Sequence, residues 1–376
     1  MARYAMPMKT KPRQTDLVAS LPATVPFIGP ENQERARGKP FRARIGANEG
    51  CFGPAPSVIS AMRDAAPGMW KYCDPDNYDL KVAITTQLGL GPANVVIGEG
   101  IDGLLDLIVR IHAAPGDVVV TSLGAYPTFN FHVAGFGAQL QTVAYAHDHE
   151  DLDGLLDAVR RADAKLVYLS NPDNPMGTWW NADEVRRFAE ALPETTMLAL
   201  DEAYGETAPS DALPPATWMR PNVVRFRTFS KAYGLAGLRC GYAFGETDVI
   251  AAFDKVRNHY GVNRMAQIAC LAAMADQTYL GEAVGRIARA RNIIAAIGRE
   301  NGLKPIESAT NFVAMDCGGD GAFALKIMQG LLARDVFVRK PSATGLDRCI
   351  RVSAGLDHEL EIFAEELPRA IAAARA

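Results

Sequence analysis

Short apolar runs alternate with helical patterns from residue 94 onward, and this alternation constrains the fold more than any other feature. The apolar runs span 94–98, 117–122, 165–170, 197–201, 223–228 and 240–245, and amphipathic patterns over 101–112, 151–162 and 182–192 lie between them. Strands that alternate with helices form right-handed βαβ units, and runs without polar alternation suit strands covered on both faces. The sequence therefore predicts an α/β fold with a mostly parallel mixed sheet sandwiched by helices.

The pattern changes after residue 263. A long helical pattern covers 281–301, strand-like runs cover 312–315, 336–339 and 349–352, and further helices are expected at 321–334 and from Asp357 onward. A chain of 376 residues also exceeds the size at which single cores usually stop growing. We therefore predict a large domain over 68–262 and a smaller α+β domain over 1–67 and 263–376, in which residues 1–30 form an extended arm and 56–66 a short helix.

Composition excludes several classes of protein. The formal net charge of −4 gives no basic surface for nucleic acid or an anionic membrane. The six cysteines show no C-x-x-C spacing, which argues against a zinc site or a disulfide framework. The sequence contains no apolar run of membrane-spanning length, and no apolar segment follows the basic N-terminus. These features predict a cytoplasmic protein without nucleic-acid or membrane partners.

The segment 228–241, Thr-Phe-Ser-Lys-Ala-Tyr-Gly-Leu-Ala-Gly-Leu-Arg-Cys-Gly, concentrates reactive groups. The Lys231 amine can form a Schiff base with an aldehyde cofactor. Ser230 and Arg239 can bind a phosphate on the same molecule, and glycines allow close approach of the backbone. Pyridoxal 5'-phosphate (PLP) carries both an aldehyde and a phosphate, although most lysines are simply solvated surface charges.

Two further candidates follow the earlier strands, where open α/β sheets bind their ligands. Gly100, Ile101 and Asp102 open a helix whose free N–H groups suit a phosphate, or else form a plain turn capped by Asp102. Tyr126 could stack on a pyridine ring or could serve packing alone.

The next two strands also end on polar residues. Asn174 lies in a Pro/Asn turn and could donate to a phenolic oxygen of the cofactor. Asp201 could pair with a protonated pyridine nitrogen, an interaction worth roughly 4 kcal/mol at about 4 Å and an effective dielectric of about 20. Tyr204 could share the phenolic oxygen with Asn174.

Arginines on the late strands are candidates for the substrate's anionic group. Arg351 interrupts an apolar run, and bidentate capture of a carboxylate or phosphate is a natural use of such a side chain. Arg339 ends the preceding strand and is a second candidate. An exposed strand position is the alternative for Arg351.

Taken together, these residues resemble the fold-type I PLP enzymes, and most closely the histidinol-phosphate aminotransferase group. The resemblance covers roughly residues 44–355 and includes Asn48-Glu49, Tyr72, Asn174-Pro175-Met176-Gly177, Asp201-Glu202-Ala203-Tyr204 and the Lys231 segment. It implies an aspartate aminotransferase-like fold, PLP in the domain 68–262, and transfer of an amino group from an amino acid or histidinol phosphate to a 2-oxo acid such as 2-oxoglutarate.

The resemblance also implies roles for single residues. Lys231 would bind the cofactor covalently and act as acid and base, with Asp201 on the ring nitrogen and Tyr204 on the phenolic oxygen. The remaining cofactor contacts would be Gly100, Ile101, Asp102, Tyr126, Asn174, Thr228, Ser230 and Arg239. Tyr72 would reach the cofactor phosphate of a neighbouring subunit, so that a homodimer shares its active sites. Arg351, Arg339, Asn48 and Phe27 would contact the substrate.

Two segments depart from the family pattern, and the first of them bears on the substrate. Phe27 stands near the position where histidinol-phosphate enzymes have a phosphate-binding tyrosine, and phenylalanine cannot donate a hydrogen bond. The family's tyrosine–proline–aspartate segment reads Tyr72-Cys73-Asp74. An aromatic amino acid aminotransferase and a lyase resembling threonine-phosphate decarboxylase therefore remain as alternatives, because both share nearly all of these motifs.

Overall fold

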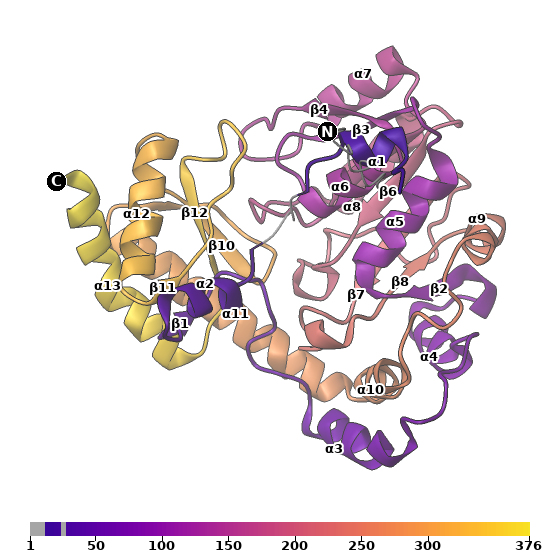
Figure 1. Ribbon diagram of the computed structural model, residues 1–376, viewed down its shortest axis with the longest axis horizontal. Coiled ribbons are helices and arrows are strands. Elements are labelled where there is room, and N and C mark those ends of the chain that lie inside the picture. Colours follow the sequence, from indigo (N-terminus) through magenta and orange to yellow (C-terminus); the bar gives the residue numbers. More distant parts are fainter. Residues whose placement is uncertain (1–11, 24–27) are drawn as a thin grey trace, which may run out of the picture.

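The computed structural model describes residues 12–23 and 28–376, and it confirms the predicted α/β class (Figure 1). The large sheet has seven strands in the order β2-β8-β7-β6-β5-β3-β4. Their bounds are β2 Val95–Gly98, β3 Val118–Ser122, β4 Gln139–Val143, β5 Leu166–Ser170, β6 Met197–Asp201, β7 Val223–Thr228 and β8 Gly241–Phe244. Only β8 runs antiparallel to its neighbours, so the sheet is mostly parallel as predicted.

Helices cover both faces of this sheet. On one face α5 (Gly100–His112) and α6 (Pro127–Gly135) share a core with the strand residues Val119, Tyr168 and Phe226. On the other face α7 (Leu152–Ala162) and α8 (Ala182–Ala191) pack on Val167 and Leu198. The sheet edge at β2 and β8 is covered by α3 (Pro56–Ala65), α4 (Tyr78–Leu88) and α10 (Arg264–Ala275), and α9 (Thr247–Ala251) follows β8. Burial on both faces explains why the central strands are continuous apolar runs.

A second core lies beside the large sheet (Figure 1). It is built by α11 (Gln277–Glu300), α12 (Gly321–Ala333), α13 (Asp357–Arg375) and the antiparallel sheet β12-β10-β9. Its strands are β9 Lys304–Pro305, β10 Phe312–Asp316 and β12 Cys349–Ser353. The strand predicted at 336–339 is shorter in the structure. Its first two residues form β11 (Val336–Phe337), which pairs with β1 (Ala43–Arg44). Arg339 then forms an isolated bridge with Arg351 on β12.

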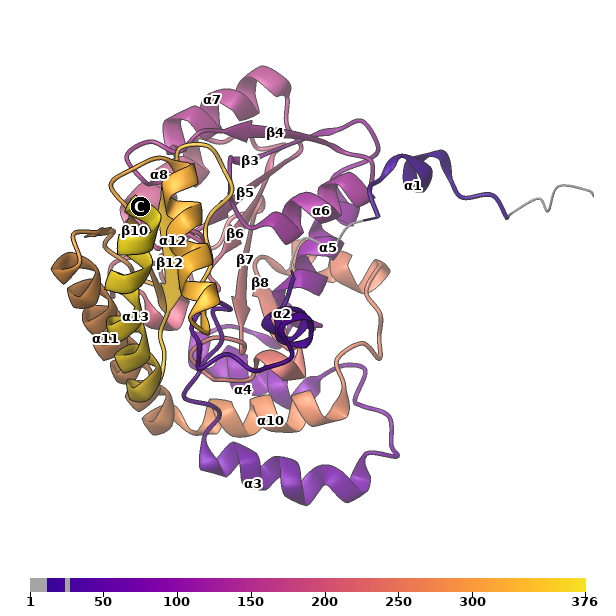
Figure 2. The ribbon, with the colours of Figure 1, turned by 60° about the vertical axis from the view of Figure 1, so that its left-hand side comes forward.

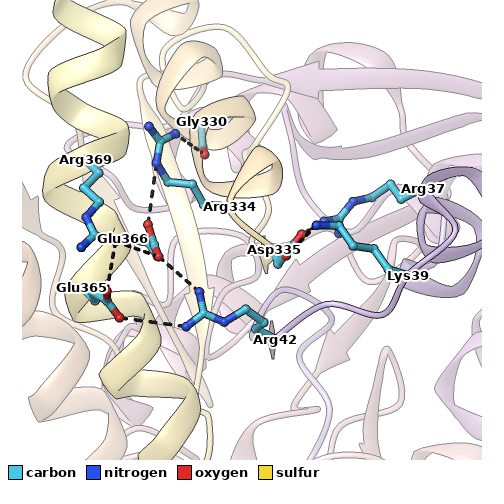
Figure 3. Close-up of polar contacts among 9 residues, drawn as sticks. All are labelled: Arg37, Lys39, Arg42, Gly330, Arg334, Asp335, Glu365, Glu366 and Arg369. Carbon is cyan, nitrogen blue, oxygen red and sulfur yellow. Dashed lines mark hydrogen bonds and ion pairs between the residues drawn. The ribbon is translucent and has the colours of Figure 1, made fainter.

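Charged contacts fasten the N-terminal segment to this second core (Figure 3). Arg37, at the end of α2 (Pro30–Arg37), and Lys39 both contact the Asp335 carboxylate. Arg42 contacts Glu366 at 3.2 Å, and this carboxylate is only 5% exposed. Arg334 and Arg369 contact it at 3.7 and 3.2 Å. A buried acid surrounded by arginines holds residues 30–44 against α12 and α13.

The arm predicted over residues 1–30 is only partly described. Within it α1 (Asp16–Ser20) buries none of its residues, and Figure 2 shows it at the margin of the molecule. Leu17 contacts the turn at Gly137 after α6, since a Cβ on that glycine would lie 3.4 Å from the leucine. No helix in 12–23 or 28–376 is long and apolar enough to cross a membrane.

The domain boundaries at 67/68 and 262/263 remain a proposal. The side chains of Ala55, Val58 and α10 pack in a core with the large sheet, whereas Ala290 and later residues pack in the second core. The change from one core to the other therefore falls within α11.

Candidate active site

The carboxyl ends of the central strands meet at one cavity of about 230 Å³. It is lined by residues from the ends of β5, β6 and β7, the start of α5, and the segment that follows β1. Eleven of the predicted site residues line it: Asn48, Ile101, Asp102, Tyr126, Asn174, Asp201, Tyr204, Thr228, Ser230, Lys231 and Arg239. Since parallel strands end at the same sheet edge, residues more than a hundred positions apart converge there.

Lys231 follows β7 and extends its amine into this cavity. Its Nζ donates to the backbone oxygen of Asn48 at 3.1 Å and lies 5.5 Å from the centroid of the Tyr204 ring. The segment after Asn48 lies very close to the lysine backbone, because a Cβ on Gly50 would come within 2.3 Å of the Lys231 oxygen. Glycine at position 50 is therefore required for this approach.

Asp201 ends β6 and is 3% exposed. Its carboxylate accepts the hydroxyl of Tyr168 at 2.7 Å and the backbone N–H of Ala203 at 2.9 Å. Burial raises the pKa of Asp201 to about 6, while both hydrogen bonds and the charge of Lys231 lower it. A carboxylate accepts about four hydrogen bonds, so lone pairs remain for a cationic donor in the cavity.

The start of α5 forms a cradle for an anion. Gly100 has φ +75°, and a Cβ there would lie 2.6 Å from Arg239 Nη2. Gly241 on β8 also lies close to this segment, since a Cβ there would lie 3.0 Å from the backbone nitrogen of Ile101. The hydroxyls of Thr228 and Ser230 are 2.9 Å apart at the same end of the cavity. Free N–H groups, an arginine and hydroxyls suit a phosphate.

Two tyrosines are held in place by side-chain hydrogen bonds. Tyr126 donates to Asp102 at 2.7 Å, and the other oxygen of Asp102 contacts Arg239 at 3.1 Å. Burial and the neighbouring Asp102 charge raise the pKa of Tyr126, so its hydroxyl is neutral. The Tyr204 hydroxyl accepts from Asn48 Nδ2 at 3.2 Å. Both aromatic rings are therefore fixed at the cavity wall.

Arg351 lies beside Asn174, outside the residues that line the cavity. Its Nη1 donates to Asn174 Oδ1 at 2.5 Å, and its guanidinium carbon lies 5.0 Å from the Phe312 ring centroid. Its Nε has no hydrogen-bond partner among the described residues. Burial lowers the pKa of Arg351 to about 10, which still leaves it charged at neutral pH. The backbone of Arg339 forms an isolated antiparallel bridge with that of Arg351, and the Arg339 side chain donates to the Ile28 oxygen at 2.5 Å.

Tyr72 does not line the cavity of this single chain. Tyr72 is 82% exposed and its ring lies 5.2 Å from that of Tyr260. Phe27 lies outside the described residues. The predicted contact of Asn48 with substrate stays a prediction, since its side chain is engaged by Tyr204 and by the Ser353 hydroxyl at 2.8 Å.

The donor set fits PLP. An amine, a buried acid, an aromatic ring and an anion cradle line one cavity, and they suit the aldehyde, the pyridine nitrogen, the ring face and the phosphate of that molecule. Residues 44–367 match the family model described as aminotransferase class I and II. The chain belongs to this family.

Individual relatives of this class I and II aminotransferase agree with the family. Over 360 residues it is 34% identical to a histidinol-phosphate aminotransferase of Anaeromyxobacter sp. (strain Fw109-5), covering 95% of this chain and 98% of the relative. It is 35% identical to histidinol-phosphate aminotransferase 1 of Thiobacillus denitrificans, covering 88% and 86%. The crystal structure of histidinol-phosphate aminotransferase from Sinorhizobium meliloti with pyridoxal 5'-phosphate matches with a TM-score of 0.94 at 55% identity, over 97% and 99% of the two chains.

These findings confirm the predicted resemblance, the cofactor and the reaction type. The chain is a PLP-dependent aminotransferase of fold-type I. Sequence reasoning missed Tyr168, whose hydroxyl reaches Asp201 from the neighbouring strand. It lies in the apolar run of β5 and reads as a core residue, because only the strand register brings the two side chains together.

Proposed function

We propose that this aminotransferase transfers the amino group of histidinol phosphate to 2-oxoglutarate. The paired arginines carry this assignment. Arg339 and Arg351 face each other in an antiparallel bridge, so their side chains leave the same face of the strands. Burial lowers the pKa of Arg351 most, and the neighbouring Arg339 charge lowers it further. Two adjacent cations suit a phosphate dianion better than a single carboxylate.

The names of the relatives support the same substrate, including that of the PLP-bound structure at 55% identity. A 2-oxo acid would use the same arginines through its carboxylates. Phe27 cannot donate to a phosphate, so the arginines would supply this contact in the present chain.

We propose the following roles for the chain's own residues. Lys231 Nζ removes the proton from the substrate carbon that bears the amino group and later returns a proton. Asp201 holds positive charge at the ring nitrogen, and Asn174 and Tyr204 bind the phenolic oxygen. Thr228, Ser230, Arg239 and the backbone at Gly100–Asp102 hold the cofactor phosphate. When bound, PLP supplies an aldehyde for amines and a ring that withdraws electrons.

We also propose a homodimer with shared active sites. Tyr72 is 82% exposed and its ring contacts that of Tyr260, which is 55% exposed, so two large aromatic side chains lie together on the surface. Trp70, two residues before Tyr72, is also 82% exposed. Exposed aromatic clusters mark interaction sites. Substituting Tyr72 by alanine would weaken PLP binding if this surface completes a neighbouring site, whereas a monomeric and fully active enzyme would contradict the proposal.

A donor and acceptor screen tests the substrate assignment. The purified holoenzyme is mixed with histidinol phosphate alone, and the absorbance of bound PLP is followed; 2-oxoglutarate should reverse the change. Phenylalanine, tyrosine and threonine phosphate are the comparison donors. A stronger response to phenylalanine or tyrosine would contradict the phosphate-bearing donor, and carbon dioxide released from threonine phosphate without a 2-oxo acid would favour the lyase.

A further inference from the structure

The Asp201 carboxylate is held by a side chain that no part of the predicted site contains. Tyr168 donates its hydroxyl hydrogen to Asp201 Oδ2 at 2.7 Å, and the N–H of Ala203 donates to Oδ1 at 2.9 Å. Each oxygen therefore has one fixed protein donor and at least one free lone pair. Two donors on different oxygens fix the plane of the carboxylate.

The Tyr168 ring is itself immobilised. It is 0% exposed and stacks on the Phe129 ring with centroids 4.5 Å apart and an interplanar angle of 20°. On β5 it lies opposite Ala199, two positions before Asp201 on β6. Burial, and the charge of Asp201, raise the pKa of the Tyr168 hydroxyl well above its usual range, so it stays a neutral donor.

The charges around Asp201 make this donor important. Asp102 raises the pKa of the Asp201 carboxyl, Lys231 lowers it, and burial raises it most. Two further titratable groups, Glu150 and Tyr126, also interact with the charge of Asp201. Lys231 is the one cation among these groups. The hydrogen bond from Tyr168 favours the charged carboxylate independently of that cation.

We propose that Tyr168 is a positioning residue for the reaction, whose hydroxyl holds Asp201 charged and oriented for the ring nitrogen of the cofactor. The inference rests on the proposed role of Asp201. It does not depend on which amino donor the enzyme uses, so a failed histidinol phosphate assay leaves it intact.

The structure supplies a matched control. Tyr145 also donates to a buried carboxylate, Asp173 Oδ1, at 2.8 Å. Tyr145→Phe and Tyr168→Phe therefore remove the same kind of hydrogen bond and leave each ring in place. Both variants should lose a similar amount of thermal stability, but only Tyr168→Phe should change the protonation of the cofactor's ring nitrogen.

The first measurement is the affinity of apoprotein for PLP. At pH 5, below the wild-type midpoint, we expect Tyr168→Phe to bind about tenfold more weakly than wild type, which corresponds to about 1.4 kcal/mol, and Tyr145→Phe to stay within about twofold. The pH midpoint below which binding weakens should move up by about one unit in Tyr168→Phe alone. Titration of free PLP is common to all variants and cancels in the comparison.

The second measurement reports the ring nitrogen directly. Holoenzyme is loaded with PLP labelled with ¹⁵N in the ring, and the ¹⁵N shift is compared across pH. The proposal is supported by a ¹⁵N shift towards the unprotonated value in Tyr168→Phe and by no such shift in Tyr145→Phe. Adding Tyr168→Phe to Asp201→Asn should then cause no further ¹⁵N shift. Equal ¹⁵N shifts and equal PLP affinities in the two tyrosine variants would show a purely structural role and overturn it.

Discussion

Replacing Arg351 by alanine tests the substrate end of the site, because this side chain combines charge, burial and an unsatisfied donor. Its Nη1 is engaged by Asn174, whereas its Nε has no partner among the described residues. Burial lowers its pKa only to about 10, so at neutral pH the cation is present and available to an anion. A carboxylate or phosphate would satisfy the remaining donors as a fork.

General magnitudes for charge pairs, applied to the buried Arg351, set the size of the effect. One charge pair at about 4 Å and an effective dielectric of about 20 is worth roughly 4 kcal/mol. Truncating one partner of a buried charge pair costs about 2–5 kcal/mol. We therefore expect Arg351→Ala to lose about 3 kcal/mol of substrate binding, or roughly 150-fold in affinity. Arg351→Lys keeps the charge but loses the fork, and should lose roughly tenfold.

The assay separates binding from chemistry. The amplitude and rate of the absorbance change of bound PLP are measured against donor concentration without acceptor, and then against 2-oxo acid concentration without donor. Half-saturation should rise for both, while PLP affinity stays unchanged. Arg339→Ala is the control, and it should weaken a phosphate-bearing donor more than a monocarboxylate. Unchanged half-saturation in Arg351→Ala, with a normal fold, would refute the assignment.

Three further predictions concern the cofactor site and the core beside it. Glu202→Gln should destabilise the protein by about 3 kcal/mol, because Glu202 and Arg225 form a pair whose side chains are 0% and 2% exposed; an unchanged melting temperature would contradict this. Gly241→Ala should weaken PLP binding about tenfold, since the new Cβ would lie 3.0 Å from the N–H nitrogen of Ile101, and fluorescence titration of apoprotein measures the loss. Wild-type apoprotein should bind PLP more weakly as pH falls through about 6, where Asp201 gains a proton; Asp201→Asn should lack this step, and a pH-independent wild type would count against the charged role of Asp201.

Much of the large sheet could be predicted because its strands are buried on both faces. Six of the seven strands read as apolar runs and were predicted within a residue or two of their observed bounds. The seventh, β4, lies at the edge of the sheet, where three of its five residues are exposed. It has no apolar run to identify it, and its place is set by parallel pairing with β3.

The site was predictable as a set of residues but not as a network. Ligand-binding groups at strand ends need only the strand assignment, and the resemblance supplied their roles. The contact of Tyr168 with Asp201 depends on the register of β5 against β6, and the pairing of Arg339 with Arg351 depends on a single bridge after β11. Neither is visible in residue spacing, because both join residues through the sheet.

The link between Lys231 and the cofactor aldehyde is the central claim, and borohydride reduction tests it most directly. Wild-type holoenzyme is reduced, digested and mapped by mass spectrometry, with Lys231→Ala treated in parallel. We predict a pyridoxyl group on the peptide that contains Lys231 and none in the variant, whose circular dichroism stays native. A pyridoxyl group on a different lysine, or no labelled peptide in the wild type, would contradict the account.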